Sequence, residues 1–349
     1  MGVFRGNDFV KFAPLIAAGA GLALGIYLVL SYGFDDVSDA LTAAGWWGLT
    51  AVSIAHLVAI GLCGLAWCML LLQTPPHVFL VFFWARILRD GVNNLIGIVP
   101  CAGEIAGGRE LTWRGVPAGI ATATTVIDVT TELISQLGFT FLGLAILLAE
   151  HPASEFAWWS AGALAVATAA IIGFVLAQKK GLFQFLESLP GQLGLLQPWE
   201  GAAAPINTAI QQIYLQRERI AAAIATHFFA WLARCVEAVI ALSLMGSSLN
   251  LAEVVALEAL IYALRTVAFA VPSGIGVQEG GYVFIGGLFG LGPDTALALS
   301  LIKRAREVAL GIPALIAWQL LETRRLWSGI GSCQCADDNS KSPNELNRG

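Results

Sequence analysis

The sequence is poor in charged residues. Only 12% of its 349 residues are Asp, Glu, Lys or Arg, about half of the roughly 25% that soluble domains carry. The charges are clustered and leave long uncharged stretches, and 57% of the residues are apolar, with a mean hydropathy of +0.74. Because about 20 consecutive apolar residues cross a bilayer, the sequence predicts an all-α integral membrane protein and argues against a soluble globular domain.

The sequence also lacks the patterns of nucleic-acid and metal binding. It has no extended run of Lys or Arg and a net charge of -5, so nucleic acid is not an expected partner. The four histidines show no ligand spacing, and Cys333-x-Cys335 in the polar tail has no matching pair elsewhere. Since metal motifs need such pairs at defined spacing, we predict no metal site and no cofactor.

Six apolar segments are long enough to cross the bilayer. They are Ala13–Phe34, Trp46–Leu72, Val116–Ala149, Phe156–Ala177, Ile220–Gly246 and Asp294–Leu321. The first is long for the core of a signal peptide and has no clear cleavage site, so we expect an uncleaved helix. Two more apolar segments, His77–Val99 and Leu251–Val271, each lead into a stretch rich in Gly and Pro.

The placement of Lys and Arg predicts the orientation, because these residues mark the cytoplasmic side. Residues 35–45 and 150–155 are acidic and contain no Lys or Arg, whereas the connector at 178–219 contains four. The charges of these loops fit a single orientation of the chain only if residues 77–115 enter and leave the membrane on the cytoplasmic face, and residues 251–292 enter and leave on the outer face. We therefore predict about six transmembrane helices plus two re-entrant hairpins, with both termini cytoplasmic.

The chain is predicted to form one polytopic membrane domain, residues 1–327, followed by a disordered polar tail, residues 328–349. Within the domain, a first half at 13–177 and a second half at 220–327 are joined by an amphipathic connector at 178–219.

The two halves match in spacing and indicate an inverted-topology repeat, which is typical of transporters. Each hairpin has a turn with one glutamate, Glu104 or Glu279, and a proline then opens a long helix. Non-helical backbone cannot face lipid, so each turn either packs tightly against protein or lines a polar cavity, and both alternatives stay open. The turn residues are Pro100, Gly103, Gly107 and Gly108 in the first hairpin and Pro272, Gly274, Gly276, Gly280 and Gly281 in the second.

Charged residues inside the predicted spans are the candidate binding residues, because each costs about 2.5–3.5 kcal/mol on insertion. Asp128 lies roughly 16 Å beyond Pro117 at about 1.5 Å per residue, near the bilayer centre, and we predict that it pairs with Lys303 or Arg304. A purely structural ion pair is the alternative. Arginines and amides of the first hairpin suit a lipid phosphate, although snorkelling to the headgroups is equally consistent. The candidates are Arg86, Arg89, Asn93, Asn94, Glu104, Arg109, Asp128, Glu132, Gln278, Glu279, Lys303, Arg304 and Glu307.

Residues 94–100, Asn-Leu-Ile-Gly-Ile-Val-Pro, followed by Gly103-Glu104, and residues 271–279, Val-Pro-Ser-Gly-Ile-Gly-Val-Gln-Glu, resemble the turns of a known family. It is the flippase-like membrane domain of lysylphosphatidylglycerol synthases and their stand-alone relatives, and the resemblance covers most of the chain. Residues 125–132 and 300–307 are most similar to the hopanoid-biosynthesis-associated membrane protein. Many relatives have arginine near the position of Asp128, so a shared charge mechanism does not follow.

The resemblance implies a protein of the bacterial inner membrane that moves or organises membrane lipids, either hopanoids or phospholipids. Together with the repeat, it leads to the hypothesis of a non-enzymatic lipid translocator, with hopanoid-type lipids as the narrower possibility. The alternatives are a membrane-embedded enzyme or accessory subunit of hopanoid or polyprenyl lipid synthesis, in which Glu104 and Glu279 act as acids or bases, and a scaffold for lipid-biosynthesis enzymes. The sequence shows nothing like the soluble aminoacyl-transferring domain of full-length synthases, so that activity is not carried over.

Overall fold

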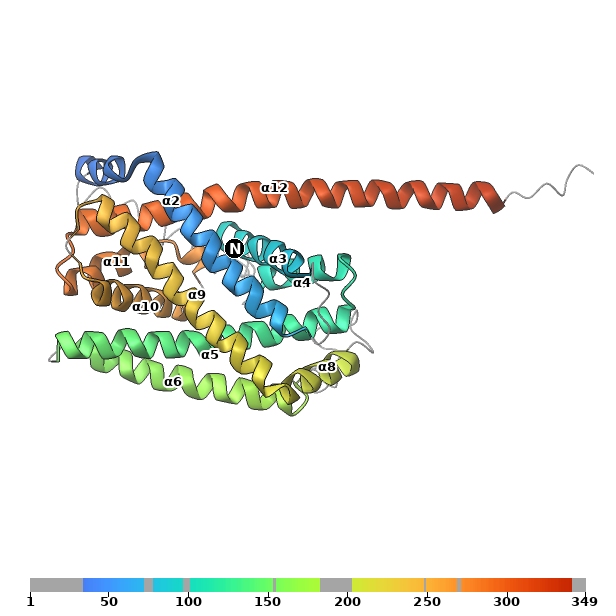
Figure 1. Ribbon diagram of the computed structural model, residues 1–349, viewed down its shortest axis with the longest axis horizontal. Helices are drawn as coiled ribbons and strands as arrows, with labels where there is room; N and C mark the ends of the chain where they lie inside the picture. Colours follow the sequence, from blue (N-terminus) through green and yellow to red (C-terminus); the bar gives the residue numbers. More distant parts are fainter. Residues whose placement is uncertain are drawn as a thin grey trace, which may run out of the picture.

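A computed structural model describes residues 34–71, 78–96, 101–152, 155–182, 203–247, 249–268 and 271–340, and it confirms the all-α fold, because every regular element within these ranges is a helix (Figure 1). The elements are α2 (Phe34–Met69), α3 (Val78–Leu95), α4 (Ala102–Trp113), α5 (Ala118–Glu150), α6 (Glu155–Lys179), α8 (Ala203–Leu215), α9 (Arg217–Leu244), α10 (Leu251–Val267), the short 3-10 helix η2 (Pro272–Gly274), α11 (Val277–Leu288) and α12 (Pro293–Ser340).

Four stretches of helix are long and apolar enough to cross a membrane, and they coincide with four of the six predicted spans. They are Gly45–Met69 in α2, Ala118–Glu150, Trp158–Lys179 and Arg217–Leu244. Gly45 has φ +58° and interrupts α2, which is why the span begins there. The predicted span at 13–34 falls almost wholly outside the described residues. The span predicted at 294–321 lies within α12. It carries four charged residues at 303–307, so it is less apolar than the four stretches above. The total of six spans and the re-entrant hairpins stay predictions.

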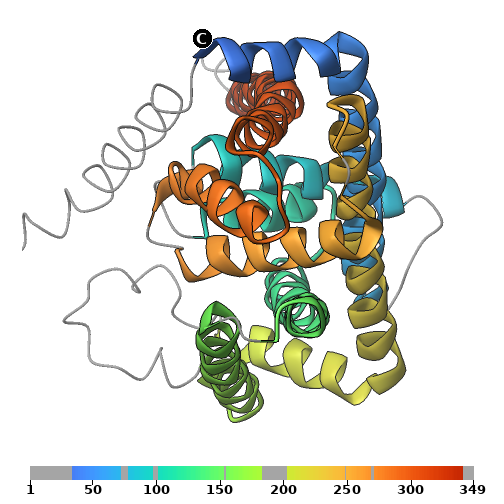
Figure 2. The ribbon, with the colours of Figure 1, turned by 90° about the vertical axis from the view of Figure 1, so that its left-hand side faces the viewer.

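The helices pack closely through small residues. α2 and α9 run side by side in both views (Figures 1 and 2). α5 approaches α10 at Gly143, where an added Cβ would lie 2.5 Å from the Cβ of Ala259. The largest apolar core joins α2, α5, α9, α10, α11 and α12, with Leu147, Leu257 and Leu299 fully buried. This packing surrounds the polar residues described below.

The connector contributes a packed helix. α8 buries one face, with Ile206, Ile210 and Ile213 spaced three to four residues apart, mainly against apolar residues of α5. Such spacing places side chains on one side of a helix. At the other end of the chain, α12 extends away from the remaining helices and continues to Ser340, into the segment predicted to be a disordered tail (Figure 1).

The two predicted turns share an unusual backbone conformation. Cys101 and Ser273, each of which follows a proline in the sequence, have φ of 63° and 54°. Left-handed φ in residues other than glycine costs about 1–3 kcal/mol. Its occurrence at both corresponding positions therefore supports the internal repeat. In each case a helix follows with a glutamate in its first turn, Glu104 in α4 and Glu279 in α11, where a negative charge is favoured by the helix dipole.

Glycines of the first turn serve tight packing. A Cβ on Gly103 would overlap the carbonyl oxygen of Arg89 and the side chain of Asn93. A Cβ on Gly107 would lie 3.0 Å from the ring of Trp67. For these two positions the structure favours the packing alternative over direct ligand contact.

Candidate functional site

A polar cavity of about 410 Å³ lies among α2, α3, α4, α5, α9, α10, α12 and η2, and we call it the central polar cavity. Its lining includes seven of the thirteen predicted binding residues, namely Arg86, Arg89, Asn93, Asn94, Glu104, Glu132 and Glu307. Residues of the lining that the sequence did not single out as binding residues are His56, Asp90, Arg234, Tyr262, Arg265, Thr266, Ser273, Gly274 and Arg306. Five guanidinium groups and four carboxylates therefore surround one space, close to charge balance.

The first half supplies a buried cluster in which two arginines hold two carboxylates. Arg86 and Arg89 lie one turn apart on α3 and are only 3% and 4% exposed. Arg86 donates two hydrogen bonds to Glu132, of 2.6 and 2.8 Å, and Arg89 donates one of 3.0 Å. Arg89 also donates to Asp128 at 2.7 Å, and the other carboxylate oxygen of Asp128 lies 3.0 Å from Nε2 of His227. Buried charges need such pairing to be tolerated.

The prediction that Asp128 pairs with Lys303 or Arg304 is wrong. Lys303 forms a buried ion pair with Glu258 of α10, and the hydroxyl of Tyr282 donates to the same carboxylate at 2.7 Å. The charged face of α5 points toward α3 and α9, whereas Lys303 on α12 faces α10 and α11. The rotation of each helix about its axis therefore decides the pairing, although all three residues lie within predicted spans.

The turn glutamates are both engaged in hydrogen bonds. One oxygen of Glu104 accepts from Nε of Arg89 and from the amide of Asn93, each at 3.1 Å. Glu279 accepts from the backbone N–H of Gly276 at 2.6 Å and from Nε of Arg304 at 3.2 Å. Glu104 lines the central polar cavity, but Glu279 is not among its lining residues. Both carboxylates therefore already have hydrogen-bond partners.

Three other predicted residues lie away from the cavity. Gln278 is buried and donates to the hydroxyl of Ser300 at 3.0 Å. Arg304 donates to the carbonyl of Ser273 at 2.7 Å and so connects α12 to the second turn. Arg109, whose side chain is 56% exposed, pairs with Glu322. These three residues therefore make contacts between helices, or between a helix and the second turn, outside the cavity.

His56 and Arg306 line the central polar cavity and were not among the predicted binding residues. Arg306 Nη1 lies 2.6 Å from Nε2 of His56, whose Nδ1 is 2.7 Å from Glu237. Because guanidinium can only donate, Nε2 of His56 accepts and Nδ1–H donates to the carboxylate. His56 is an isolated polar residue in an apolar span, and Glu237 lies three residues after Arg234 in another. The cost of polar groups in membranes was the signal that could have identified them.

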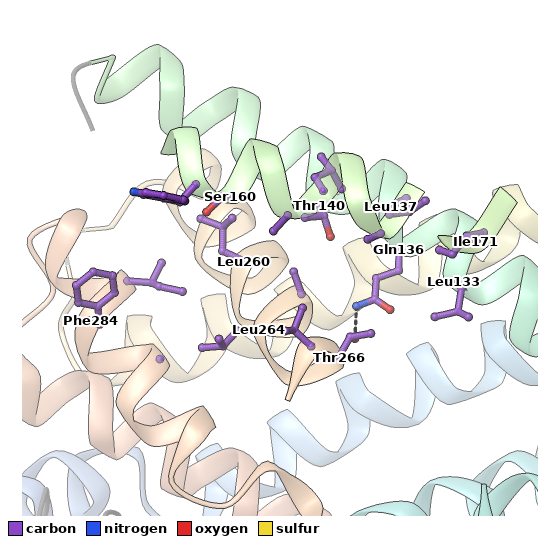
Figure 3. A pocket seen from close by; sticks show the side chains of 18 of the residues that line it. Leu133, Gln136, Leu137, Thr140, Ser160, Ile171, Leu260, Leu264, Thr266 and Phe284 are labelled. Carbon is purple, nitrogen blue, oxygen red and sulfur yellow. Dashed lines mark hydrogen bonds between the residues drawn. The ribbon is translucent and has the colours of Figure 1, made fainter. Parts of the chain in front are cut away.

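A second space, of about 460 Å³, lies beside the polar cavity and is lined mainly by apolar side chains of α5, α6, α10 and α11 (Figure 3). We call it the apolar groove. Its lining includes exposed apolar residues such as Phe284 and Val267, which are 57% and 69% exposed. Thr266 lines both the apolar groove and the central polar cavity, and its hydroxyl accepts a 2.6 Å hydrogen bond from Gln136 (Figure 3).

Residues of the second turn reach both spaces. Gly274, with φ +60°, lines the central polar cavity, and Gly280 and Gly281 line the apolar groove. For these positions the structure favours a lining role. Pro100 lies outside the described residues.

These features define a multi-pass α-helical membrane protein with a polar cavity beside an apolar groove. The family model named Lysylphosphatidylglycerol synthase TM region matches residues 15–314. The chain belongs to this family of membrane domains, as the two turn motifs indicated. Comparisons with curated proteins and with solved structures found no match.

Proposed function

We propose that this protein translocates a membrane lipid, with the headgroup in the central polar cavity and the tail in the apolar groove. The observation that carries the proposal is that the two spaces share the lining residue Thr266. A lipid needs a polar and an apolar compartment side by side, and here one residue belongs to both. The volume of the polar cavity lies within the roughly 300–1,000 Å³ typical of small-molecule sites.

The charges around the cavity support a polar headgroup as its occupant. Nine charged side chains line it, and each costs about 2.5–3.5 kcal/mol at the centre of a membrane helix, so such residues are rarely without function. Arginine is well suited to phosphate oxygens because its planar guanidinium group can donate two parallel hydrogen bonds. The interleaved carboxylates supply acceptors for hydroxyl or amino groups of the same headgroup.

The wider setting follows from the family and the repeat. We place the protein in the bacterial inner membrane with both termini cytoplasmic, and we take alternating exposure of the cavity between the two halves as the mechanism. Hopanoid-type lipids are the narrower substrate proposal, and enzymes of lipid biosynthesis are candidate partners. An enzymatic role is less favoured, because Glu104 and Glu279 are both held by hydrogen bonds from arginine and from amide groups.

The test is transport by the purified protein in liposomes without any other protein, with and without a proton gradient. A fluorescent phospholipid is placed in both leaflets, and an impermeant reductant bleaches the outer one. Lipid translocation makes the inner-leaflet label accessible, so bleaching goes beyond the outer-leaflet share. Bleaching that stops at that share under both conditions refutes the proposal. A chemically changed lipid, detected by mass spectrometry, would instead indicate an enzyme. A scaffold would neither move the lipid nor change it.

A pair of variants on α6 tests the apolar groove. Ala167 lines the groove, whereas Ala165, on the same helix, is exposed and is not part of the lining. Ala167→Phe should reduce the transport rate because the ring occupies the space for the tail, and Ala165→Phe should leave it unchanged. Equal rates for the two variants would exclude the groove as the path of the tail.

A further inference from the structure

Three potential metal ligands converge beside the central polar cavity. Cys63 of α2, Glu132 of α5 and His227 of α9 each place one ligand atom within 4.8 Å of the other two. Cys63 and His227 are 2% and 1% exposed. Their spacing of 69 and 95 residues along the chain matches no metal motif, which explains why sequence patterns did not indicate this site.

His227 has the arrangement of a metal-binding histidine. Its Nε2 lies 3.0 Å from Asp128, a carboxylate that accepts the ring N–H. Its Nδ1 is buried and has no hydrogen-bond partner. Metal-ligating histidines almost always donate their second ring N–H to a carboxylate, carbonyl or water. Asp128 fixes Nε2 as the donor, and in the neutral imidazole Nδ1 then offers its lone pair to a metal.

The other two side chains retain the capacity to bind a metal. Oε2 of Glu132 accepts from both Arg86 and Arg89, whereas Oε1 accepts only one hydrogen bond, of 2.6 Å from Arg86. A carboxylate oxygen has two lone pairs, so Oε1 keeps one. The sulfur of Cys63 lies 3.8 Å from Nη2 of Arg234, which places a positive charge beside the thiolate that a metal requires.

We propose that Cys63, Glu132 and His227 bind a zinc ion and that Asp128 orients His227. One sulfur, one nitrogen and one oxygen match the ligand types of zinc, and three protein ligands leave one tetrahedral position open. Glu132 lines the central polar cavity, which gives the ion a route to the site. An ion bound here would link α2 and α5 of the first half to α9 of the second half beside the cavity, so zinc release would have to precede a movement of the halves.

The test measures metal bound by the full chain in detergent, after treatment with a chelator and dialysis against zinc, by elemental analysis. We expect about one zinc per chain in the wild type and in Cys68→Ser, which alters another buried cysteine of α2 outside the three-residue group. Cys63→Ser and His227→Gln should lose the zinc. Asp128→Asn should weaken zinc affinity by about 10–100-fold, as removal of an outer-shell partner does.

Two further readouts keep the result independent of folding defects in the variants. Cobalt in place of zinc should give a thiolate-to-cobalt charge-transfer band, and zinc should slow alkylation of Cys63 but not of Cys68 in the wild type. Failure of the wild type to bind either metal, unchanged alkylation of Cys63 with zinc, or full zinc content in Cys63→Ser would overturn the proposal. Metal content is measured without lipid, so this outcome does not depend on lipid translocation.

Discussion

The buried pair of Lys303 and Glu258 gives the sharpest test of the pairing that the structure shows. Lys303 is 3% exposed and Glu258 fully buried. Removing one partner of a buried ion pair costs about 3–5 kcal/mol, because the other charge stays buried without compensation, whereas replacing both is often neutral. We therefore expect Lys303→Met and Glu258→Gln each to be strongly destabilising. The double variant should recover most of the loss, since the amide oxygen introduced by Glu258→Gln can still accept from Tyr282.

The measurement is thermal unfolding in detergent, monitored by circular dichroism. At roughly 2 °C for each kcal/mol in a large domain, each single variant should lower the melting temperature by about 6–10 °C, and the double variant by much less. The matched control combines Lys303→Met with Asp128→Asn, which have no contact, so their effects should add to within about 0.5 kcal/mol. Recovery in this control pair, together with additive losses for Lys303 and Glu258, would refute the pairing and restore the one expected from the sequence.

The remaining predictions concern packing, surface charge and topology. Gly103→Ala should destabilise by about 1–3 kcal/mol through overpacking, whereas Gly162→Ala, with open space around its Cβ, should be neutral or stabilising in the same melting assay. Arg109→Ala should change stability by at most about 1 kcal/mol, because its ion pair is exposed. Cys101, which is exposed, should react with an impermeant thiol reagent in inside-out membrane vesicles but not in intact cells. Ser273→Cys in a Cys101→Ala background should react in intact cells but not in inside-out vesicles, and reaction of both positions from the same side would contradict the inverted repeat.

The sequence predicted the spans well because their signal is local. Hydropathy placed one span at Val116–Ala149, and the helix in the structure is Ala118–Glu150. The left-handed residues after the two prolines were not predicted, but the turns that contain them were, because Gly and Pro mark such positions directly. Length, apolar content and turn residues can each be evaluated within a short window of sequence.

The contacts of the site could be predicted only in part. The sequence identified Arg86, Arg89 and Glu132 as polar residues within apolar surroundings, and the structure brings them together. It did not identify the partner of Asp128, because the partner depends on which helices are neighbours and on their rotation. His227 and Cys63 were missed for the same reason, since each is a single polar or weakly polar residue in an otherwise apolar span.

The distribution of ion pairs bears on how two halves of this protein could move against each other. Within the described residues, the buried pairs between Arg or Lys and a carboxylate that lie nearest the cavity stay inside one half, as Arg89 with Glu132 and Lys303 with Glu258 do. The Arg–carboxylate pair that joins the halves, Arg109 with Glu322, is exposed on its arginine side. Exposed pairs contribute only about 0–1 kcal/mol, so this one opposes a relative movement very little.

Polar contacts between the halves near the cavity use weaker partners. They include His56 with Glu237 and Arg306, His227 with Asp128, Asn94 with Arg265, and Gln136 with Thr266. Each involves a histidine or an amide, and such hydrogen bonds contribute about 0.5–3 kcal/mol, depending on whether one partner is charged. Separating a buried Arg–carboxylate pair would cost more than that. Apart from Arg234, whose guanidinium contacts Cys63 of the other half, the buried Arg and Lys side chains near the cavity pair with carboxylates of their own half. In the metal-free protein, the movement of the halves that the proposed transport requires would therefore break mainly these weaker contacts.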